Sequence, residues 1–530
     1  MKRLAILFCI ALPSVLLAEG IEGQKQLKKL INAEFAISQF YVDSVNTDKL
    51  VEDAIKGMID KLDPHSSYTT PAETKDLEEP LQGNFSGIGI QFNMKEDTLY
   101  VIQTIVGGPS ERVGILAGDR IIEVNDTVIA GVKMKNSDIM KRLRGPKGTE
   151  VNVLVKRRNV PEPIKFRIVR DNIPLFSIDA AYMADNITGY VRISRFAEKT
   201  FDEFTDAVKK LKKQGMKQII IDLSDNGGGY LQIAADLANE FLQKGQTIVY
   251  TEGRNAPRHD AVAEGGGSLQ NNKVVIMVNQ YSASASEILS GAIQDWDRGV
   301  IVGRRTFGKG LVQRPFRFDD GSMIRLTIAR YYTPSGRCIQ KPYEAGDKKS
   351  YEKDIYNRYK DGELISADSI HFADSLKFTT LKHQRIIYGG GGIMPDVFVP
   401  LDTLEYTDYY RDLLAKGIIN RFVISHVDNN RKLILKKYKT VKDFDCGFIV
   451  DDSLMDELKK LGEADSVKFN EEQYEKSKEL LKSVTKALIA RDVYTDPGAF
   501  YVVSNHRNPI FKKALEIIND DKIYYGKLEK

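Results

Sequence analysis

The 530-residue sequence predicts a multidomain α/β protein, with an α/β core, an inserted β-rich domain, a helical N-terminal arm and a mostly helical C-terminal extension. The length suits about three or four domains of roughly 150 residues. Short alternating strands dominate residues 83 to about 172, whereas buried strands alternate with amphipathic helices from about 174 to 400. With 42% hydrophobic and 28% charged residues, the composition is that of an ordinary globular chain.

The composition excludes several kinds of function. Basic and acidic residues number 77 and 73, a formal charge of +4, so no nucleic-acid partner is expected. The six histidines and three cysteines form no zinc-binding spacing, and neither a metal nor a cofactor is expected. Cys338 and Cys446 could pair outside the cytosol, and the sequence alone does not decide this.

The first 18 residues have the features of an export signal. Lys2 and Arg3 precede an uncharged, apolar stretch that ends at the small residue Ala18. This pattern predicts a signal peptide over residues 1–18, with an uncleaved anchor as the alternative. We therefore expect a soluble protein in the periplasm or cell envelope, or outside the cell.

The helices and strands are expected in a fixed order along the chain. Apolar residues recur at helical spacing from residue 21 to about 62, where Asp63-Pro64 ends the second helix. In the core, apolar strands at 217–223 and 273–278 each precede an amphipathic helix, at 231–242 and 285–295, and a short strand follows at 300–302. Residues 401–530 are charged and mostly helical.

Serine residues gather where the second of these strands turns into a helix. Ser282, Ser284 and Ser286 lie between the apolar strand and the helix that begins near Ala285. A serine there points out of the end of the sheet, close to free backbone N–H groups that can stabilise an oxyanion. The alternative is structural, because Ser284 and Glu287 also have the spacing of a capping box.

A lysine follows in the segment Thr306 to Gln313. Lys309 is flanked by Gly308 and Gly310, and strand alternation is expected to turn Lys309, Leu311 and Gln313 to one side. A lysine can serve as the general base for a serine if burial lowers its pKa from about 10.4 towards neutrality. The alternative is a surface lysine in a glycine turn.

Three glycines, Gly227–Gly229, also follow a buried strand, either to bring N–H groups to a carbonyl or simply to form a tight turn.

The sequence pattern of a phosphate-binding loop overlaps the same segment. Gly303, Gly308 and Lys309 match its pattern, but Gly310 stands where the magnesium-binding Ser or Thr is required. The residues after Gly310 also look extended rather than helical. This alternative is therefore disfavoured.

These segments together resemble the carboxyl-terminal processing peptidases, also called tail-specific proteases, over about residues 25 to 400. The resemblance is carried by Leu62–Tyr68, Phe85–Gly89, Ala117–Asp119, Leu143–Gly145, Gly189–Ile193, Gly227–Gly229, Ser282–Ile288, Thr306–Gln313 and Gly392–Asp396. It implies a Ser–Lys dyad, with Ser284 as the nucleophile, Lys309 as the general base and Gln313 as its orienter. It also implies an oxyanion hole formed by the N–H groups of Ala285 and of one glycine of the turn. Within the turn, the match to the family favours Gly228. Ser224, Asp225 and Gly227 depart from the family's turn, which leaves the choice of glycine open.

Residues 83–172 resemble a PDZ domain. The segment Gly87-Ile88-Gly89-Ile90 is similar to the carboxylate-binding loop of these domains, whose N–H groups accept a terminal carboxylate while the peptide adds as a β-strand. The alternative is a plain glycine turn. Arg144, in a Leu-Arg-Gly turn, is a candidate for an electrostatic link between this domain and the core.

The resemblance implies an exported serine endopeptidase that recognises protein C-termini, which we expect to be apolar, and cleaves upstream of them. The alternative from another class is a non-catalytic PDZ-type scaffold, and a His-dependent protease is disfavoured because no Gly-Asp-Ser-Gly segment is present. The expected divisions are the signal peptide at 1–18, the N-terminal helical region at 19–82, the PDZ domain at 83–172, the peptidase core at 173–400 and the C-terminal extension at 401–530. That extension could support a homo-oligomer or could simply cap the core.

Overall fold

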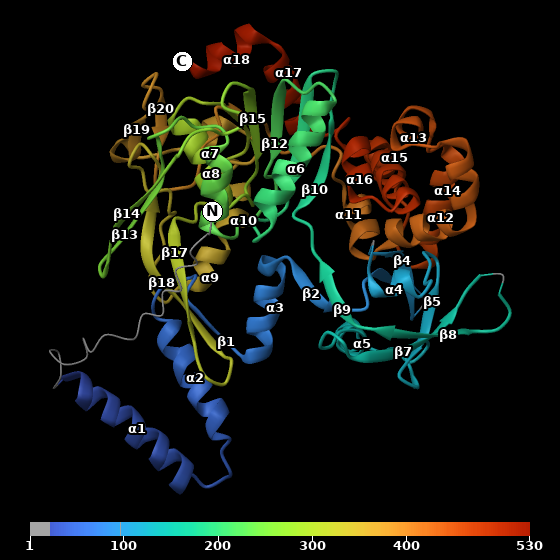
Figure 1. Ribbon diagram of the computed structural model, residues 1–530, viewed down its shortest axis with the longest axis horizontal. Coiled ribbons are helices and arrows are strands. Elements are labelled where there is room, and N and C mark those ends of the chain that lie inside the picture. Colours follow the sequence, from blue (N-terminus) through green and yellow to red (C-terminus); the bar gives the residue numbers. More distant parts are fainter. Residues whose placement is uncertain (1–21, 96, 106, 159, 530) are drawn as a thin grey trace, which may run out of the picture.

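A computed structural model of the chain describes residues 22–529 except 96, 106 and 159. The predicted signal peptide at residues 1–18 lies outside this range. Figure 1 shows an α/β core, a smaller β-rich unit below it and helices at both ends of the sequence. The predicted α/β fold class with helical terminal regions is confirmed.

The core is built on a six-stranded sheet in the order β10-β11-β12-β15-β16-β21. Only the edge strand β10 runs antiparallel to its neighbour, and the other neighbouring pairs are parallel. Parallel strands buried on both faces read as continuous apolar runs, which is why Lys273–Val278 was recognisable as a strand. The strands are β10 (Ile178–Met183), β11 (Thr188–Ile193), β12 (Gln218–Asp222), β15 (Lys273–Val278), β16 (Val300–Gly303) and β21 (Val397–Phe398).

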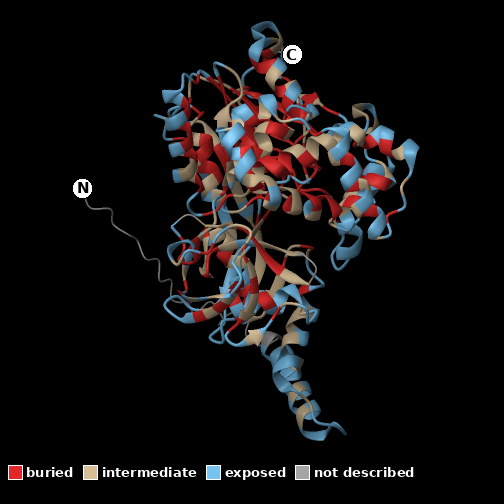
Figure 2. Cartoon of the chain, turned by 90° about the vertical axis from the view of Figure 1, so that its right-hand side faces the viewer, coloured by how far each residue is buried: buried red, intermediate tan, exposed pale blue. Residues whose placement is uncertain are grey.

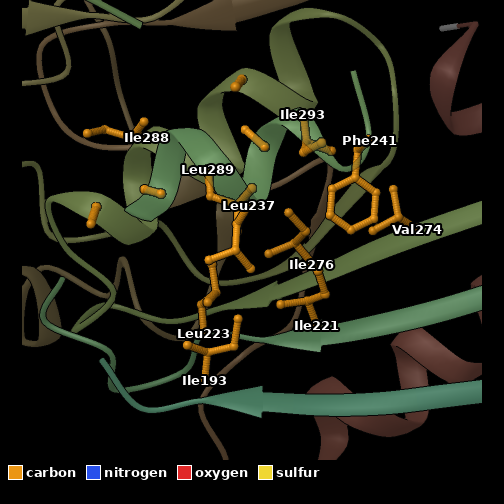
Figure 3. Close-up of a cluster of buried hydrophobic side chains, with 14 of the residues drawn as sticks. Ile193, Ile221, Leu223, Leu237, Phe241, Val274, Ile276, Ile288, Leu289 and Ile293 are labelled. Carbon is orange, nitrogen blue, oxygen red and sulfur yellow. The ribbon is translucent and has the colours of Figure 1, made fainter. Parts of the chain in front are cut away.

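Three helices, α6 (Thr200–Lys213), α7 (Leu231–Asn239) and α8 (Ala285–Asp295), cover one face of this sheet. Figure 3 shows the contact, in which Ile221 and Ile276 of the sheet meet side chains such as Leu237 and Leu289. All four side chains are fully buried. This packing fixes the start of α8 against the ends of β12 and β15.

The opposite face is covered by the last two helices of the chain, α17 (Pro509–Asn519) and α18 (Asp521–Leu528). Phe511, Ile517 and Tyr524 pack there against sheet residues such as Val275. The end of the predicted C-terminal extension therefore caps the core, one of the two roles that the sequence left open. The division at residue 400 itself stays a prediction.

A second sheet, in the order β1-β18-β13-β14 with β17 paired to β18, lies beside the core. Its first strand comes from the N-terminal region, and Ser67 of β1 lies opposite Arg325 of β18. The β17–β18 pair contains a bulge between Val312 and Gln313. The strands are β1 (Ser67–Thr69), β13 (Thr247–Gly253), β14 (Ala256–Val262), β17 (Leu311–Arg317) and β18 (Met323–Tyr332). Smaller elements nearby are α9 (Lys348–Glu352), α10 (Asp354–Lys360), β19 (Lys377–Thr379) and β20 (Ile386–Tyr388).

The predicted N-terminal helices are present as α1 (Glu22–Phe40) and α2 (Thr47–Ile59), followed by α3 (Pro71–Gln82). Figure 2 shows α1 and α2 as a largely exposed arm that extends away from the rest of the molecule. Leu30, Ile31 and Phe35, three of the apolar residues of α1, are exposed.

The β-rich unit has its own sheet, in the order β3-β4-β5-β7-β8 with β6 beside β5, and its own apolar core. A two-stranded ribbon, β2 and β9, leads the chain into and out of it. One helix of this unit is α5 (Asn136–Leu143). The other elements are α4 (Pro109–Arg112), β2 (Asn84–Gly87), β3 (Ile90–Lys95), β4 (Thr98–Thr104), β5 (Arg120–Val124), β6 (Thr127–Val128), β7 (Glu150–Lys156), β8 (Ile164–Val169) and β9 (Asp171–Pro174).

Six further helices form a separate apolar cluster near the C-terminus. They are α11 (Asp408–Ala415), α12 (Ile418–Lys437), α13 (Val441–Gly447), α14 (Asp452–Ala464), α15 (Glu471–Tyr494) and α16 (Pro497–Ser504). Ile424 of α12 packs on Tyr100 and Ile102 of β4, and Arg120 pairs with Asp428 at 3.4 Å. These helices therefore contact the β-rich unit.

Across the described residues, no helix has the length and apolarity needed to cross a membrane. Both Cys338 and Cys446 are free thiols.

Candidate active site

Ser284 lies at the carboxyl end of the parallel sheet, between β15 and α8. It is the N-cap residue of α8 and has φ 57° and ψ −114°, in the left-handed region that a residue with a side chain rarely adopts. Strained conformations of this kind persist only where surrounding contacts maintain them, and they cluster at functional sites. Ser284 is also the only partly exposed residue among the three serines of the segment.

The other two serines are fully buried and serve structural roles. The Ser282 hydroxyl donates to the carbonyl oxygen of Leu223 at 2.8 Å, and the Ser286 hydroxyl donates to that of Asn226 at 2.9 Å. Both bonds tie the segment to the turn after β12. The resemblance alone selected Ser284 from the sequence, and these contacts give a physical reason for the same choice.

Lys309 lies in the loop between β16 and β17, which packs against the serine segment. The N–H of Phe307 donates to the carbonyl oxygen of Ser282 at 3.0 Å. Burial, and secondly the positive charge of Arg325, lower the pKa of Lys309 from 10.5 to about 8. The alternative of a solvated surface lysine is therefore disfavoured. The strand β17 that follows is incompatible with a phosphate-binding loop, which must open into a helix.

Glu287 connects the serine and lysine segments. It is fully buried, and its Oε2 atom accepts hydrogen bonds from the N–H groups of Ser284 at 2.8 Å and Lys309 at 2.9 Å. Its Oε1 atom accepts from the hydroxyl of Thr306 at 2.5 Å and the N–H of Gly308 at 2.7 Å. Burial raises the pKa of Glu287 to about 7, although these bonds oppose the shift. The sequence indicated Glu287 only as half of a capping box, so its contact with the lysine loop was missed.

Gln313 lies at the bulge of β17, so the strict alternation expected for Lys309, Leu311 and Gln313 does not hold. Its Nε2 atom donates to the Thr327 hydroxyl at 3.3 Å, and that hydroxyl donates to Asp63 Oδ1 at 2.9 Å. A hydroxyl has one proton, which Thr327 gives to the carboxylate, so Thr327 can only accept from Gln313. The Gln313 carbonyl oxygen consequently stays available as an acceptor for an amine.

The loop at residues 63–66 is a part of the site that sequence reasoning missed. Asp63 also accepts hydrogen bonds from the N–H of His65 at 2.9 Å and the hydroxyl of Ser66 at 2.5 Å. Burial, and secondly the charge of Lys309, lower the pKa of His65 to about 3, so its imidazole is neutral. Such a histidine is a weak base, which disfavours a His-dependent mechanism. The Asp-Pro-His-Ser segment was identified from the sequence, but only as a helix end and as part of the resemblance.

The glycine turn after β12 lies directly against Ser284. Gly228 has φ +103°, and a Cβ atom there would lie 2.7 Å from the Ser284 Cβ and 3.0 Å from the Ala285 nitrogen. The N–H of Gly228 donates to the side-chain oxygen of Asn226 at 2.8 Å. Among the described residues, the N–H of Ala285 has no hydrogen-bond partner. Of the two expected oxyanion donors, Ala285 is thus free and Gly228 is engaged.

The structure brings Ser284, Lys309, Ala285 and Gly228 together at one end of the core sheet, whereas Gln313 lies on β17 of the second sheet. Within the described residues, the Ser284 hydroxyl and the Lys309 amine form no hydrogen bond with each other. Catalytic contacts are often long without substrate and tighten in the complex.

The expected carboxylate-binding loop lies in the β-rich unit, between β2 and β3. Gly89 has φ +74°, and no described residue accepts a hydrogen bond from the N–H groups of Ile88 or Gly89. Strand β3, which begins at Ile90, is an edge strand of its sheet. The loop therefore presents two free donors beside a free strand edge.

Arg144 joins the β-rich unit to α3. Its guanidinium lies 3.2 Å from Glu79 and 4.8 Å from the centre of the Phe85 ring. The neighbouring Glu78 pairs with Arg317 at the end of β17. The expected link of Arg144 therefore reaches the second sheet through α3 rather than contacting the core directly.

Comparisons with known proteins match four parts of the chain. The model of peptidase family S41 matches residues 187–347, and a PDZ domain model matches residues 86–168. The N-terminal domain of the activating protease CtpB matches residues 16–74, and a family of unknown function, DUF8443, matches residues 409–496.

Several curated proteins are similar over most of their own length. A carboxy-terminal-processing protease of Bartonella bacilliformis is 37% identical over 324 residues, which cover 60% of this chain and 73% of that protein. The carboxy-terminal processing protease CtpA of Bacillus subtilis is 35% identical over 350 residues, covering 64% and 74%. Among solved structures, a photosystem II D1 C-terminal processing protease is 28% identical with a TM-score of 0.33, covering 58% of this chain and 88% of that one.

An α/β peptidase core joined to a PDZ domain defines a serine-type peptidase. Within that class, the chain belongs to the carboxy-terminal processing protease family.

Proposed function

We propose that the chain is an exported endopeptidase that binds protein C-termini through its PDZ domain and cleaves upstream of them with a Ser284–Lys309 dyad oriented by Gln313. The main support is the shared contact with Glu287, whose Oε2 atom accepts from the N–H groups of both Ser284 and Lys309. The lowered pKa of Lys309, about 8, is the second support. At pH 7 roughly a tenth of such an amine is neutral, against less than about one in a thousand at the unperturbed value.

In the proposed chemistry these side chains act together with the backbone N–H of Ala285 and a water molecule. Neutral Lys309 accepts the proton of the Ser284 hydroxyl as its oxygen attacks the scissile carbonyl, and the free N–H of Ala285 donates to the resulting oxyanion. The Lys309 ammonium then protonates the leaving amine. A water molecule, deprotonated by the same amine, releases the acyl group from Ser284. The acceptor oxygen of Gln313 orients the amine in each step.

This mechanism predicts a pH effect for Arg325, whose buried Nε atom has no hydrogen-bond partner among the described residues. The charge of Arg325 helps to lower the pKa of Lys309. Arg325→Met should therefore raise that pKa, so that less neutral amine is present and the acid limb of kcat/KM moves to higher pH. The loss should be evident at pH 7 and should shrink as pH rises well above 8.

The matched control is Arg330→Met, which removes an exposed arginine from the same strand. Its profile should overlay that of the wild type. An acid limb that is unchanged in Arg325→Met, or that moves to lower pH, would contradict a lysine base at this position.

C-terminal recognition is supported by the free N–H groups of Ile88 and Gly89 beside the edge strand β3. Two N–H groups can bind a terminal carboxylate while the preceding peptide pairs with the strand edge. We therefore expect substrates with a free C-terminal carboxylate to be cut at least about tenfold faster, in kcat/KM, than the same peptides with a C-terminal amide.

Paired peptides with an apolar or a charged last residue test the expected apolar preference in the same assay. Equal rates for the acid and the amide would refute C-terminal recognition while leaving the dyad intact. Binding of the acid without any cleavage would instead favour the scaffold alternative.

The proposal that the protein is exported is based on the sequence of residues 1–18. Secretion of the full chain fused to a periplasm-dependent reporter should be lost when those residues are deleted. A secreted reporter without them would contradict the proposal.

A further inference from the structure

A second contact between the serine and lysine segments involves Tyr331 of β18. Tyr331 is 1% exposed, and its ring packs in the main apolar core of the α/β unit. Its hydroxyl donates to the carbonyl oxygen of Lys309 and lies 3.1 Å from the carbonyl oxygen of Ser284. Burial raises the pKa of Tyr331 well above 10.0, so the hydroxyl keeps its proton.

Tyr331 and Glu287 hold opposite sides of the same two residues. Glu287 accepts from the N–H groups of Ser284 and Lys309, whereas the Tyr331 hydroxyl contacts their two carbonyl oxygens. Buried side chains from α8 and β18 therefore fix the peptide group before Ser284 and those on both sides of Lys309. The Ser284 carbonyl oxygen also accepts from the N–H groups of Glu287 at 2.8 Å and Ile288 at 3.0 Å. These contacts also hold the strained backbone of Ser284 in place.

We propose that Tyr331 is a positioning residue that sets the distance between Ser284 and Lys309, an inference that rests on the proposed dyad. A misplacement of about 1 Å between reacting groups can cost about a hundredfold in rate. The Tyr331 hydroxyl acts through the Lys309 carbonyl oxygen, to which it donates, and through its contact with the Ser284 carbonyl oxygen, not through the substrate. Its loss should lower the rate of chemistry without weakening substrate binding.

Tyr331→Phe removes only the hydroxyl and keeps the ring in the core. Tyr332→Phe is a matched control on the same strand, because neighbouring strand residues point to opposite faces. Tyr332 stacks on Tyr250 with ring centres 4.8 Å apart, away from the two carbonyls. Both variants are made in the full chain, with Glu287→Gln as a second variant that disturbs the other side of the pair.

The measurement is kcat and KM for a denatured protein with an apolar C-terminus, together with Tm, at a temperature well below unfolding. Ser284→Ala and Lys309→Met are measured first to establish the dyad. We expect Tyr331→Phe to lower kcat about tenfold or more with KM within about twofold, and Glu287→Gln to lower kcat as well. Tyr332→Phe should keep both constants within about twofold.

A failure of the proposed dyad can be distinguished from a failure of the positioning role of Tyr331. Activity that persists in Ser284→Ala or Lys309→Met would refute the proposed dyad, whatever Tyr331→Phe does. If the dyad variants are inactive but Tyr331→Phe matches Tyr332→Phe in kcat, the positioning role is refuted. A Tyr331→Phe defect confined to KM or to Tm, with kcat unchanged, would refute it equally.

Discussion

Ser284→Ala and Lys309→Met are each expected to reduce kcat/KM by a factor of at least about a thousand. The first removes the attacking oxygen, and the second removes the amine that must accept its proton. The losses should not add in the double variant, since nucleophile and base act as one unit. The assay is the mass of fragments released from a denatured protein with an apolar C-terminus.

Ser290→Ala is the matched control for the serine variant. Ser290 is buried on the same helix, and its hydroxyl donates to the carbonyl oxygen of Ser286 at 2.8 Å. Its removal should leave cleavage within a few-fold of the wild type. Comparable activity in Lys309→Met and the wild type, with both proteins folded, would be incompatible with a lysine base.

Gly228→Ala is expected to reduce kcat/KM by about a hundredfold or more. A Cβ atom at Gly228 would lie 2.7 Å from the Ser284 Cβ and 2.8 Å from the Ala283 oxygen, and φ +103° is unfavourable for alanine. Either the turn or Ser284 must move, and in the proposed mechanism both line the position where the oxyanion forms. Steady-state kinetics should show the loss mainly in kcat.

Gly227→Ala is the adjacent control, because a Cβ atom there would meet nothing within 4 Å. It should retain activity within a few-fold. If both variants lose activity equally, the effect comes from general stiffening of the turn. If neither loses activity, the close approach of Gly228 to Ser284 has no catalytic role.

The sequence predicted the local elements of the site well, because each is marked by residues that lie close together in the chain. The apolar run of β15 and the amphipathic pattern of α8 predicted both elements with their observed bounds, Lys273–Val278 and Ala285–Asp295. The glycine turn after β12 and the strand after Lys309 were predicted for the same reason. The choice of Ser284 as the candidate nucleophile among the three serines followed only from the resemblance.

The contacts that join these elements could not be predicted from periodicity. Asp63 and Thr327 are 264 residues apart, and their hydrogen bond depends on the pairing of β1 with β18. The bulge before Gln313 breaks the expected alternation, and no residue in the segment signals it. Similarly, the apolar pattern of residues 509–528 predicts a buried face but does not say that this face covers the main sheet.

The most direct test of the Ser–Lys dyad is the site and rate of labelling by a serine-reactive fluorophosphonate, read by mass as a function of pH. The dyad predicts a single adduct on Ser284, forming faster as pH rises through about 8, the pKa of Lys309. In Lys309→Met the adduct should form far more slowly and without that rise. An adduct on another residue, or equal rates and pH dependence in the wild type and Lys309→Met, would contradict it.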